Sequence, residues 1–526
     1  MLRLHRSRRH EVVLASLASI ASLALSAAPA NADIGYDDLV ARLGGVGVPT
    51  GAGVNVVQAE APVSPGNYGP DQSISDFIGI TFTAMSGGSG GNSWHATTVA
   101  QNFYGEWNSI ATGITGVWLY EAGNFVQSGY LRLGMGSASL PLMPPGASKV
   151  FNHSWIGSFG STSLDNEANR RADFAQNRDF TLFCVGLNNG AGVPPSLMSH
   201  NYNGLSVGLE DGAHSWGVVP AGYDGAGRMK PEVVAPQSAT SWATGIVSSV
   251  AALLYETAMT PPLNANPDSA RGVVIKSCMM SGANHRDTWT NAPATSGPNR
   301  GVTSKPLDQV YGADRVDINR SHWVLTSGEQ EGSTTVPSMP NISPRGWDFR
   351  SMAAGNAAYY RFKLTQPVED VSILVAWNRN FGSTITAGIV ANQTLTLWKV
   401  QQGSTTLETL VGDPGIPYFM NGNVVSQSAV DNVEHLYLHD LAAGEYVIQL
   451  QRVDGLTTSV QTAISWIMPE TPACAFADFN CDGVVDGDDL GSLLGEWGDC
   501  PECIGDLNGD GMVDGDDLGA LLGEWS

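Results

Sequence analysis

The segment that decides the fold is residues 227–254. It reads Gly227-Arg-Met-Lys-Pro-Glu-Val-Val-Ala-Pro-Gln-Ser-Ala-Thr-Ser-Trp-Ala-Thr-Gly245 and continues as the apolar run Ile246-Val-Ser-Ser-Val-Ala-Ala-Leu-Leu254. The apolar run predicts a buried helix, and Ser241 stands just before it. At a helix N-terminus a serine hydroxyl meets backbone donors and the positive end of the helix dipole, which favours developing negative charge. A serine in this place alone is more often an N-cap.

A serine nucleophile needs a base, a group that orients the base, and donors for the oxyanion. His95 is the candidate base, because the small and apolar residues after it favour a helix. Glu60 ends a short apolar strand and is the candidate acid. Asn188 follows a second apolar strand and opens a glycine-rich loop, which suits an oxyanion donor. Taken singly, each residue also has an ordinary structural explanation: His95 as a hydrogen-bonded structural histidine, Glu60 as a solvated strand end, and Asn188 as a turn residue.

With this order of acid, histidine, asparagine and serine, the chain resembles the subtilisin-like serine peptidases (subtilases) over residues 40–325. The family's serine motif Gly-Thr-Ser-Met-Ala-x-Pro is matched by Ala239-Thr-Ser-Trp-Ala-Thr-Gly245, and Lys-Pro-Asp-Val-Val-Ala-Pro by Lys230-Pro-Glu-Val-Val-Ala-Pro236. Three partial matches are His95-Ala-Thr-Thr-Val-Ala100, Asn152-His-Ser-Trp-Ile-Gly157 for the substrate strand, and Leu187-Asn-Asn-Gly190 for the oxyanion loop.

The resemblance implies a serine endopeptidase that hydrolyses protein or peptide substrates and requires no cofactor for catalysis. Ser241 would attack the peptide carbonyl and His95 would carry the proton. Glu60 would orient His95, while Asn188 and the Ser241 N–H would hold the oxyanion. The residues that the resemblance assigns to substrate binding are Ser154, Trp155 and Gly157.

Three departures from the family bear on activity: Glu60 in place of aspartate, Ala96 in place of glycine, and Gly245 in place of proline. A glutamate keeps the charge, but its extra methylene moves the carboxylate, and a misplacement of about 1 Å can cost about 100-fold in rate. Asp71 and Asp76, in the next loop, are alternative orienters. The alternative to an enzyme is a catalytically degenerate subtilase scaffold that binds extended peptides by strand addition.

The N-terminus predicts export. Arginines precede the apolar run Val12–Ala27, and Ala30-Asn-Ala32 is typical of a signal-peptide cleavage site, so residues 1–32 are expected to be a signal peptide. The protein is therefore predicted to be secreted, extracellular or at the cell surface, with no membrane insertion. The net charge of −24 argues against nucleic-acid binding.

The C-terminal residues 474–526 are strongly acidic, contain no Lys or Arg, and repeat every 28 residues. Each repeat has oxygen-bearing side chains at loop positions 1, 3, 5, 9 and 12 and glycine at 6, the pattern of a calcium loop, with a backbone carbonyl at 7. The predicted ligands are Asp478, Asn480, Asp482, Val484, Asp486 and Asp489, then Asp506, Asn508, Asp510, Met512, Asp514 and Asp517. A leucine and tryptophan pattern after each loop predicts an amphipathic helix.

Two loop-helix repeats of this kind resemble a type I dockerin. The resemblance implies two bound calcium ions and a cohesin-like partner, in assemblies often linked to polysaccharide catabolism. A calcium-stabilised terminal cap or sorting tag, or recruitment of the chain as cargo to a surface, remain alternatives. In an exported chain, Cys474, Cys481, Cys500 and Cys503 favour two disulfides, and of the three pairings those that join the two repeats are preferred. Cys184 and Cys278 are expected to be buried thiols.

Between these parts, residues 331–343 have the composition of a linker. Short alternating strands over 344–470 predict an antiparallel β-sandwich, similar to the jelly-roll modules that follow many secreted subtilases, with Tyr359, Trp377 and Trp398 in its core. The chain is thus predicted to contain an α/β subtilisin-like domain (33–330) with a mostly parallel sheet flanked by helices. The sandwich follows, and then a small all-α calcium-binding dockerin-like module (474–526).

Overall fold

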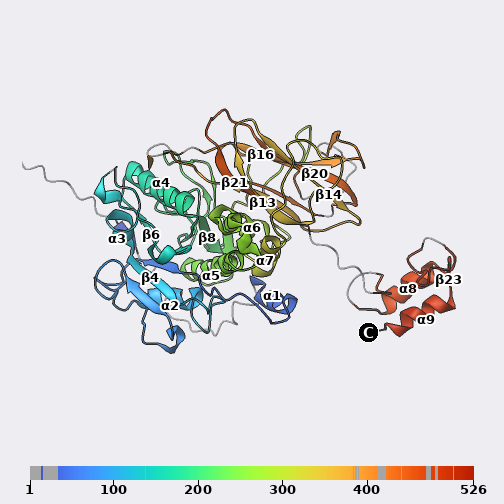
Figure 1. The fold of residues 1–526 in the computed structure, drawn as a ribbon, viewed down its shortest axis with the longest axis horizontal. Helices are drawn as coiled ribbons and strands as arrows, with labels where there is room; N and C mark the ends of the chain where they lie inside the picture. The colour runs from blue at the N-terminus through green and yellow to red at the C-terminus, as the bar shows by residue number, and fades with distance from the viewer. Residues whose placement is uncertain are drawn as a thin grey trace, which may run out of the picture. The chain divides into compact units, whose positions relative to one another are not determined.

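A computed structural model describes most of the chain in two compact units, residues 1–467 and 468–526 (Figure 1). The described residues are 13–15, 34–136, 138–382, 384–385, 388, 390–410, 422–439, 441–468, 476–479, 484–500 and 503–525. Of the predicted signal peptide, only β1 (Val13–Ala15) is among them. No helix in the described part of the chain is long and apolar enough to cross a membrane.

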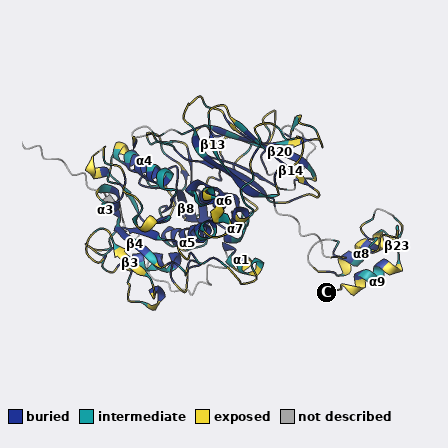
Figure 2. Ribbon diagram, viewed as in Figure 1, coloured by how far each residue is buried: buried dark blue, intermediate teal, exposed yellow. Residues whose placement is uncertain are grey.

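The first unit is built on a seven-stranded sheet with the order β11-β8-β7-β5-β2-β4-β3, in which all neighbours are parallel. Its strands are β2 (Val56–Glu60), β3 (Thr81–Ala84), β4 (Gly116–Glu121), β5 (Val150–His153), β7 (Leu182–Gly186), β8 (Leu205–Leu209) and β11 (Val233–Ala235). The inner strands β2, β5, β7 and β8 are buried along their whole length (Figure 2), as expected for a parallel sheet covered on both faces, whereas β4 is only partly buried. The predicted parallel α/β sheet is therefore present.

Helices cover both faces of this sheet. They are α1 (Tyr36–Arg42), α2 (Trp94–Phe103), α3 (Ala122–Gln127), α4 (Thr162–Asp179), α5 (Thr240–Met259), α6 (Gly272–Ser281) and α7 (Ile318–Thr326), with short 3₁₀ turns η2 (Ser75–Phe77), η3 (Leu133–Met135), η4 (Pro145–Ala147), η5 (Leu263–Ala265) and η6 (Pro267–Ala270). Side chains of one strand alternate between two cores. Val56 packs in the core of α2 and α5, whereas Val57 packs in the core of α3 and α4.

The β-rich part of the first unit has two sheets. One is β13 (Arg345–Met352), β21 (Val460–Ile467), β15 (Val371–Trp377) and β19 (Val433–Leu438); the other is β12 (Val302–Thr303), β18 (Val425–Ser426), β16 (Gln393–Val400), β20 (Gly444–Arg452) and β14 (Ala357–Leu364), with β17 (Leu407–Thr409) on β16. All pairs are antiparallel except β12 with β18. The strands are thus present, while a jelly-roll sandwich stays a prediction. Trp377 is fully buried, but Tyr359 and Trp398 are partly exposed, which corrects their expected place in the core.

The α/β part and the β-rich part are bonded to each other. Helix α6 packs on β15 and β21, where the Ser277 and Ser465 hydroxyls lie 2.6 Å apart. The segment 331–343, predicted as a linker, is tied to β14: the Ser333 and Tyr359 backbones pair, and the Asn341 N–H donates to the Arg361 carbonyl. Two short antiparallel pairs complete the unit, β9 (Gly217–Val218) with β10 (Met229–Lys230), and β1 with β6 (Ile156–Ser158).

The second unit contains two similar loop-helix segments, α8 (Gly487–Gly495) and α9 (Gly515–Gly523), and a short pair of β22 (Gly498–Asp499) with β23 (Met512–Val513). Its small core includes Leu493 and Leu521, one leucine from each helix. The structure pairs Cys500 with Cys503, so the preferred pairing between repeats is wrong for these two cysteines. Cys474 and Cys481 lie outside the described residues. Cys184 and Cys278, in the first unit, are buried free thiols, as predicted.

Candidate active site

The structure brings three predicted catalytic side chains into one hydrogen-bonded chain. Glu60 is the last residue of β2, His95 lies in the first turn of α2, and Ser241 lies in the first turn of α5. Nδ1 of His95 is 2.9 Å from Oε2 of Glu60, and Nε2 of His95 is 3.0 Å from Oγ of Ser241. These distances lie within the range for a nucleophile, its base and the group that orients the base.

The charges determine which ring nitrogen carries the proton. An ionised carboxylate only accepts hydrogen bonds, so Glu60 requires N–H at Nδ1 of His95. In neutral histidine Nε2 is then free of its proton and accepts the hydroxyl hydrogen of Ser241. The arrangement can therefore take a proton from the serine and hold the resulting imidazolium beside a negative charge.

The alternative orienters are engaged elsewhere. Oδ1 of Asp71 accepts the backbone N–H and the hydroxyl of Ser73, at 3.0 and 2.6 Å. Asp76 accepts the Trp107 N–H at 3.1 Å and the Gln101 amide at 2.7 Å. Of the three carboxylates considered, Glu60 is the one that contacts His95, and its carboxylate reaches Nδ1 despite the extra methylene.

Sequence patterns missed two residues behind the acid. Nε2 of Gln58 donates to Oε1 of Glu60 at 3.0 Å and to the Ala96 carbonyl at 2.9 Å, and the Tyr104 hydroxyl donates to Oε1 of Gln58. Burial, together with the charge of Glu60, raises the pKa of Tyr104 well above its usual value of 10, so the hydroxyl keeps its proton. A polar residue two positions before the acid, inside an otherwise apolar strand, was the available signal.

The loop that carries Asn188, the predicted oxyanion donor, is anchored by backbone and side-chain bonds. The Asn188 N–H donates to the Ser215 hydroxyl at 3.1 Å, and the Ser215 N–H donates to the Asn188 carbonyl at 2.9 Å. Its neighbour Asn189 accepts the Thr240 N–H at 2.9 Å through Oδ1, which joins this loop to the start of α5. Asn188 itself is half-buried at the end of β7. The anchoring role of Asn189 was not predicted.

The residues predicted to bind substrate occupy different surroundings. The Ser154 hydroxyl donates to the Ser241 carbonyl at 3.0 Å, which links β5 to the helix of the nucleophile. Trp155 is 1% exposed and packs in the core between the sheet and α4, so it does not face a cleft. Gly157 lies in β6, which pairs antiparallel with β1, opposite Leu14. Of the three, Gly157 is on a strand edge that pairs with an extended segment.

Two tryptophans flank the imidazole. The ring of Trp242 lies 5.1 Å from that of His95, and the ring of Trp94 lies 5.6 Å away at a steep angle. His95 is 4% exposed, whereas Trp94 is 56% exposed. The histidine is therefore covered beside the two indoles, of which Trp94 is exposed and Trp242 partly buried.

All six predicted ligands of the second calcium loop, between Asp506 and Asp517, are among the described residues. The Asp506 carboxylate accepts the N–H groups of residues 509–511 at 2.8 to 3.1 Å, so the loop folds around its first acid. Asp514 and Asp517 form a capping box at the start of α9. In the described part of the chain, no three His, Cys, Asp or Glu residues are grouped to hold a metal ion, and Asn480 and Asp482 lie outside it. The oxygen chemistry fits calcium, and the sites stay a prediction.

Comparison with known proteins gives distant structural neighbours. No family model and no curated protein matches the chain. Solved structures similar to it include the patellamide maturation protease (18% identity, 53% of this chain and 98% of that one, TM-score 0.34). Others are a cold-adapted subtilisin-like serine proteinase (20%, 43% and 82%, TM-score 0.28) and the epidermin leader peptide processing serine protease from Staphylococcus aureus (12%, 56% and 79%, TM-score 0.32). Of these three, two are named as serine proteases and one as a maturation protease; each is similar at low identity and over part of this chain.

Proposed function

We propose that this chain is a secreted serine endopeptidase of the subtilisin-like type. The observation that carries the proposal is the continuous bond chain from Glu60 through His95 to Ser241, at 2.9 and 3.0 Å. Its three members come from residues far apart in the sequence and lie at a strand end and two helix starts. If Ser241 were only a helix N-cap, neither hydrogen bond of His95, to Glu60 or to Ser241, would be explained.

The proposed reaction follows from this geometry. Oγ of Ser241 forms a bond to the peptide carbonyl carbon while its proton passes to Nε2 of His95, and Glu60 stabilises the imidazolium. Negative charge on the carbonyl oxygen is met by the Ser241 N–H and the Asn188 amide. His95 then gives its proton to the leaving amine as the C–N bond breaks. Water releases the acyl group by the same steps in reverse, with His95 as base.

An extended peptide is the proposed substrate. The pairing of β6 with β1 supports strand addition at this edge, because backbone groups of residues 156–158 accept an antiparallel partner there. Strand addition uses the substrate main chain, so it favours unfolded or loop segments over any particular side chain. The competing proposal, a binding scaffold without catalysis, uses the same edge.

We further propose that the C-terminal unit is a dockerin-like module with two calcium ions and a cohesin-like partner. Its acidic loops repel one another without cations. We expect calorimetric titration of the calcium-free full chain with calcium chloride to give two sites, and Asp517→Asn to lose one. Asp516→Asn is the matched control, since residue 516 lies outside the ligand pattern. No binding, or equal stoichiometry in both variants, contradicts this assignment.

The peptidase proposal is tested with a fluorophosphonate probe, which reacts with activated serines. We expect stoichiometric labelling of the full chain and a loss of at least about 1,000-fold in labelling rate for Ser241→Ala. Ser238→Ala is the control, because Ser238 is exposed and three residues away on the same segment. Unlabelled wild type between pH 5 and 10, or labelling that survives Ser241→Ala, would favour the binding scaffold.

A further inference from the structure

Gln58 is an unusual residue for its position. Residues 56, 58 and 60 of β2 point to the same face of the sheet, and Val56 there lies in the apolar core of α2 and α5. Gln58 is 1% exposed, and burying an amide costs free energy unless it is hydrogen-bonded. Each polar atom of this amide has a partner: Glu60 and Ala96 for the nitrogen, and Tyr104 for the oxygen.

Those three partners connect the acid to the helix that carries the base. Oε1 of Glu60 is bonded to Gln58, which leaves Oε2 for His95 and sets the plane of the carboxylate. The Ala96 carbonyl belongs to the residue directly after His95, and Tyr104 caps the far end of α2. The Gln58 amide thus bridges β2 and α2 and orients the Glu60 carboxylate toward the His95 imidazole.

A glutamate needs this support more than an aspartate would. The glutamate side chain has one more rotatable bond than aspartate. Its carboxylate can therefore adopt more rotamers when no hydrogen bond holds its second oxygen. A shorter acid at residue 60 would withdraw its carboxylate by about one C–C bond, about 1.5 Å, from both His95 and Gln58. The bonds to Gln58 and His95 are therefore matched to the length of glutamate.

We propose that Gln58, supported by Tyr104, is a positioning residue that fits a glutamate to the orienting role in this site. This inference rests on the proposed peptidase function. Gln58 does not touch the reacting atoms; it acts through Glu60. This role also accounts for glutamate in place of aspartate at residue 60, because the buried Gln58 amide holds the second oxygen of the longer side chain.

Activity provides the first arm of the test. Gln58→Leu is expected to lower kcat on a peptide substrate about 10- to 100-fold with KM within about 2-fold, because a loosened orienter misplaces the base. Tyr104→Phe, which removes one oxygen atom, is expected to act in the same direction more weakly. Once Glu60→Asp is present, Gln58→Leu should cost little more, since coupled residues are not additive. Additive losses would overturn the inference.

Gln101→Leu is the matched control. Gln101 also lies on α2 and also donates to a carboxylate, that of Asp76, at 2.7 Å. The substitution removes the same kind of bond outside the site, so it should leave kcat within about 2-fold. An equal loss of kcat in Gln101→Leu and Gln58→Leu would mean that Gln58 only stabilises the fold and does not position Glu60.

The second arm is independent of turnover. In the full chain with Ser241→Ala, proton NMR should show a low-field resonance from the His95 Nδ1–H bonded to Glu60, and Gln58→Leu should weaken or abolish it. If this happens while the wild-type chain hydrolyses no peptide, the positioning role stands and the peptidase proposal fails. If the resonance is absent from Ser241→Ala, or unchanged by Gln58→Leu, the inference is overturned.

Discussion

Replacing Glu60 by glutamine is expected to lower kcat about 10⁴-fold, the scale seen when the orienting acid of a serine protease triad becomes an amide. The amide nitrogen of the new side chain would face Nδ1 of His95 in place of Oε2, which lies 2.9 Å away in the native site. Nδ1 would then have to accept, the proton would move to Nε2, and Nε2 could no longer take the proton of Ser241. Steady-state kinetics on a peptide substrate measures this loss, with KM expected to change little.

The neighbouring strand supplies a control for this substitution. Glu121 ends β4 in register with Glu60 and accepts the N–H groups of Gly123 and Asn124, each at 2.8 Å. Glu121→Gln changes the same chemical group at the same edge of the sheet but leaves His95 untouched. We expect kcat within about 2-fold of wild type. A Glu60→Gln chain that keeps most of its kcat would mean that another group orients the base.

The catalytic candidates could be found from the sequence because each stands at a recognisable boundary. Ser241 and His95 each lie in the first turn of a helix, and Glu60 ends an apolar strand. In a parallel sheet the carboxyl ends of the strands and the starts of the helices that follow them lie at the same end of the sheet. Residues at these boundaries are therefore predicted to lie near one another in space. The distances could not be predicted, and the length of Glu60 proved compatible with a 2.9 Å contact to His95.

The residues that sequence patterns missed depend on contacts between distant segments. Gln58 meets Ala96 and Tyr104 across 38 and 46 residues, and no periodic pattern encodes such a meeting. Trp155 was misplaced for a related reason: a residue just beyond the end of β5 follows no fixed alternation, and its indole is buried in the core.

Part of the fold was also beyond the sequence. Apolar runs predicted the parallel sheet, yet its order, with β2 between β4 and β5, depends on crossovers that composition does not specify. Residues 302–303, assigned to the α/β part, form β12 beside β18 of the β-rich part. The two parts therefore share a sheet as well as a helix interface, and a boundary drawn from composition near residue 331 cuts through segments that are hydrogen-bonded together.

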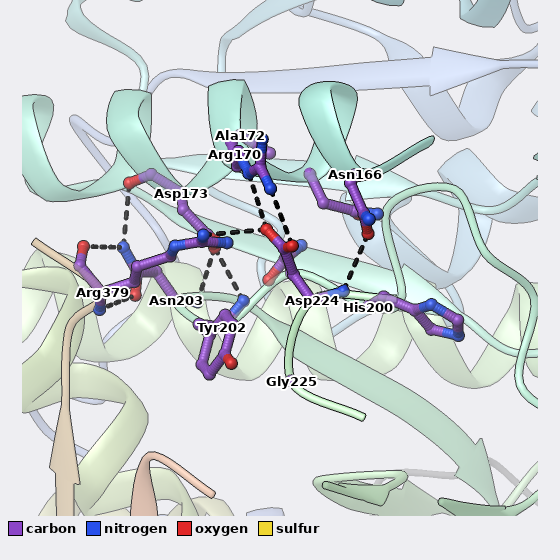
Figure 3. Close-up of polar contacts among 12 residues, drawn as sticks. Asn166, Arg170, Ala172, Asp173, His200, Tyr202, Asn203, Asp224, Gly225 and Arg379 are labelled. Carbon is purple, nitrogen blue, oxygen red and sulfur yellow. Dashed lines mark hydrogen bonds and ion pairs between the residues drawn. The ribbon is translucent and has the colours of Figure 1, made fainter. Parts of the chain in front are cut away.

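A partly buried charge network makes the same connection (Figure 3). Arg379 follows β15 in the β-rich part, is 6% exposed, and reaches two acids of the α/β part. Its guanidinium lies 2.8 Å from Oδ2 of Asp224 and 3.7 Å from Oδ2 of Asp173. Asp224 is also held by Arg170 of α4, at 2.6 and 2.8 Å. Arg379 is therefore a cation of one part that neutralises carboxylates of the other.

Arg379→Met is expected to lower the free energy of unfolding by about 3 kcal/mol, because removing one cation leaves a buried carboxylate with less compensating charge. Asp173 is fully buried, and the N–H groups of Tyr202 and Asn203, at 2.7 and 3.0 Å, together with the charge of Arg228, offset its charge only in part. Urea denaturation of the full chain at pH 7.5 measures the loss. Arg315→Met is the control, since Arg315 forms a partly exposed pair with Glu210 at 3.0 Å and should cost less than about 1 kcal/mol.

The pH dependence of the Arg379→Met defect distinguishes lost charge from lost packing. Burial raises the pKa of Asp173 above its usual value of 3.8, and the charge of Arg379 opposes that rise. Without the arginine, the pKa of Asp173 in the folded protein rises further. A carboxyl whose pKa is higher in the folded than in the unfolded state stabilises the native state while it is protonated, and this stabilisation is lost as the pH rises through the folded pKa. The difference between Arg379→Met and wild type should therefore shrink as the pH falls below 7.5 into the range where Asp173 of the variant takes up a proton. A difference that stays constant over this range would assign the defect to the missing side-chain volume, and one that grows on acidification would contradict the electrostatic account of this interface.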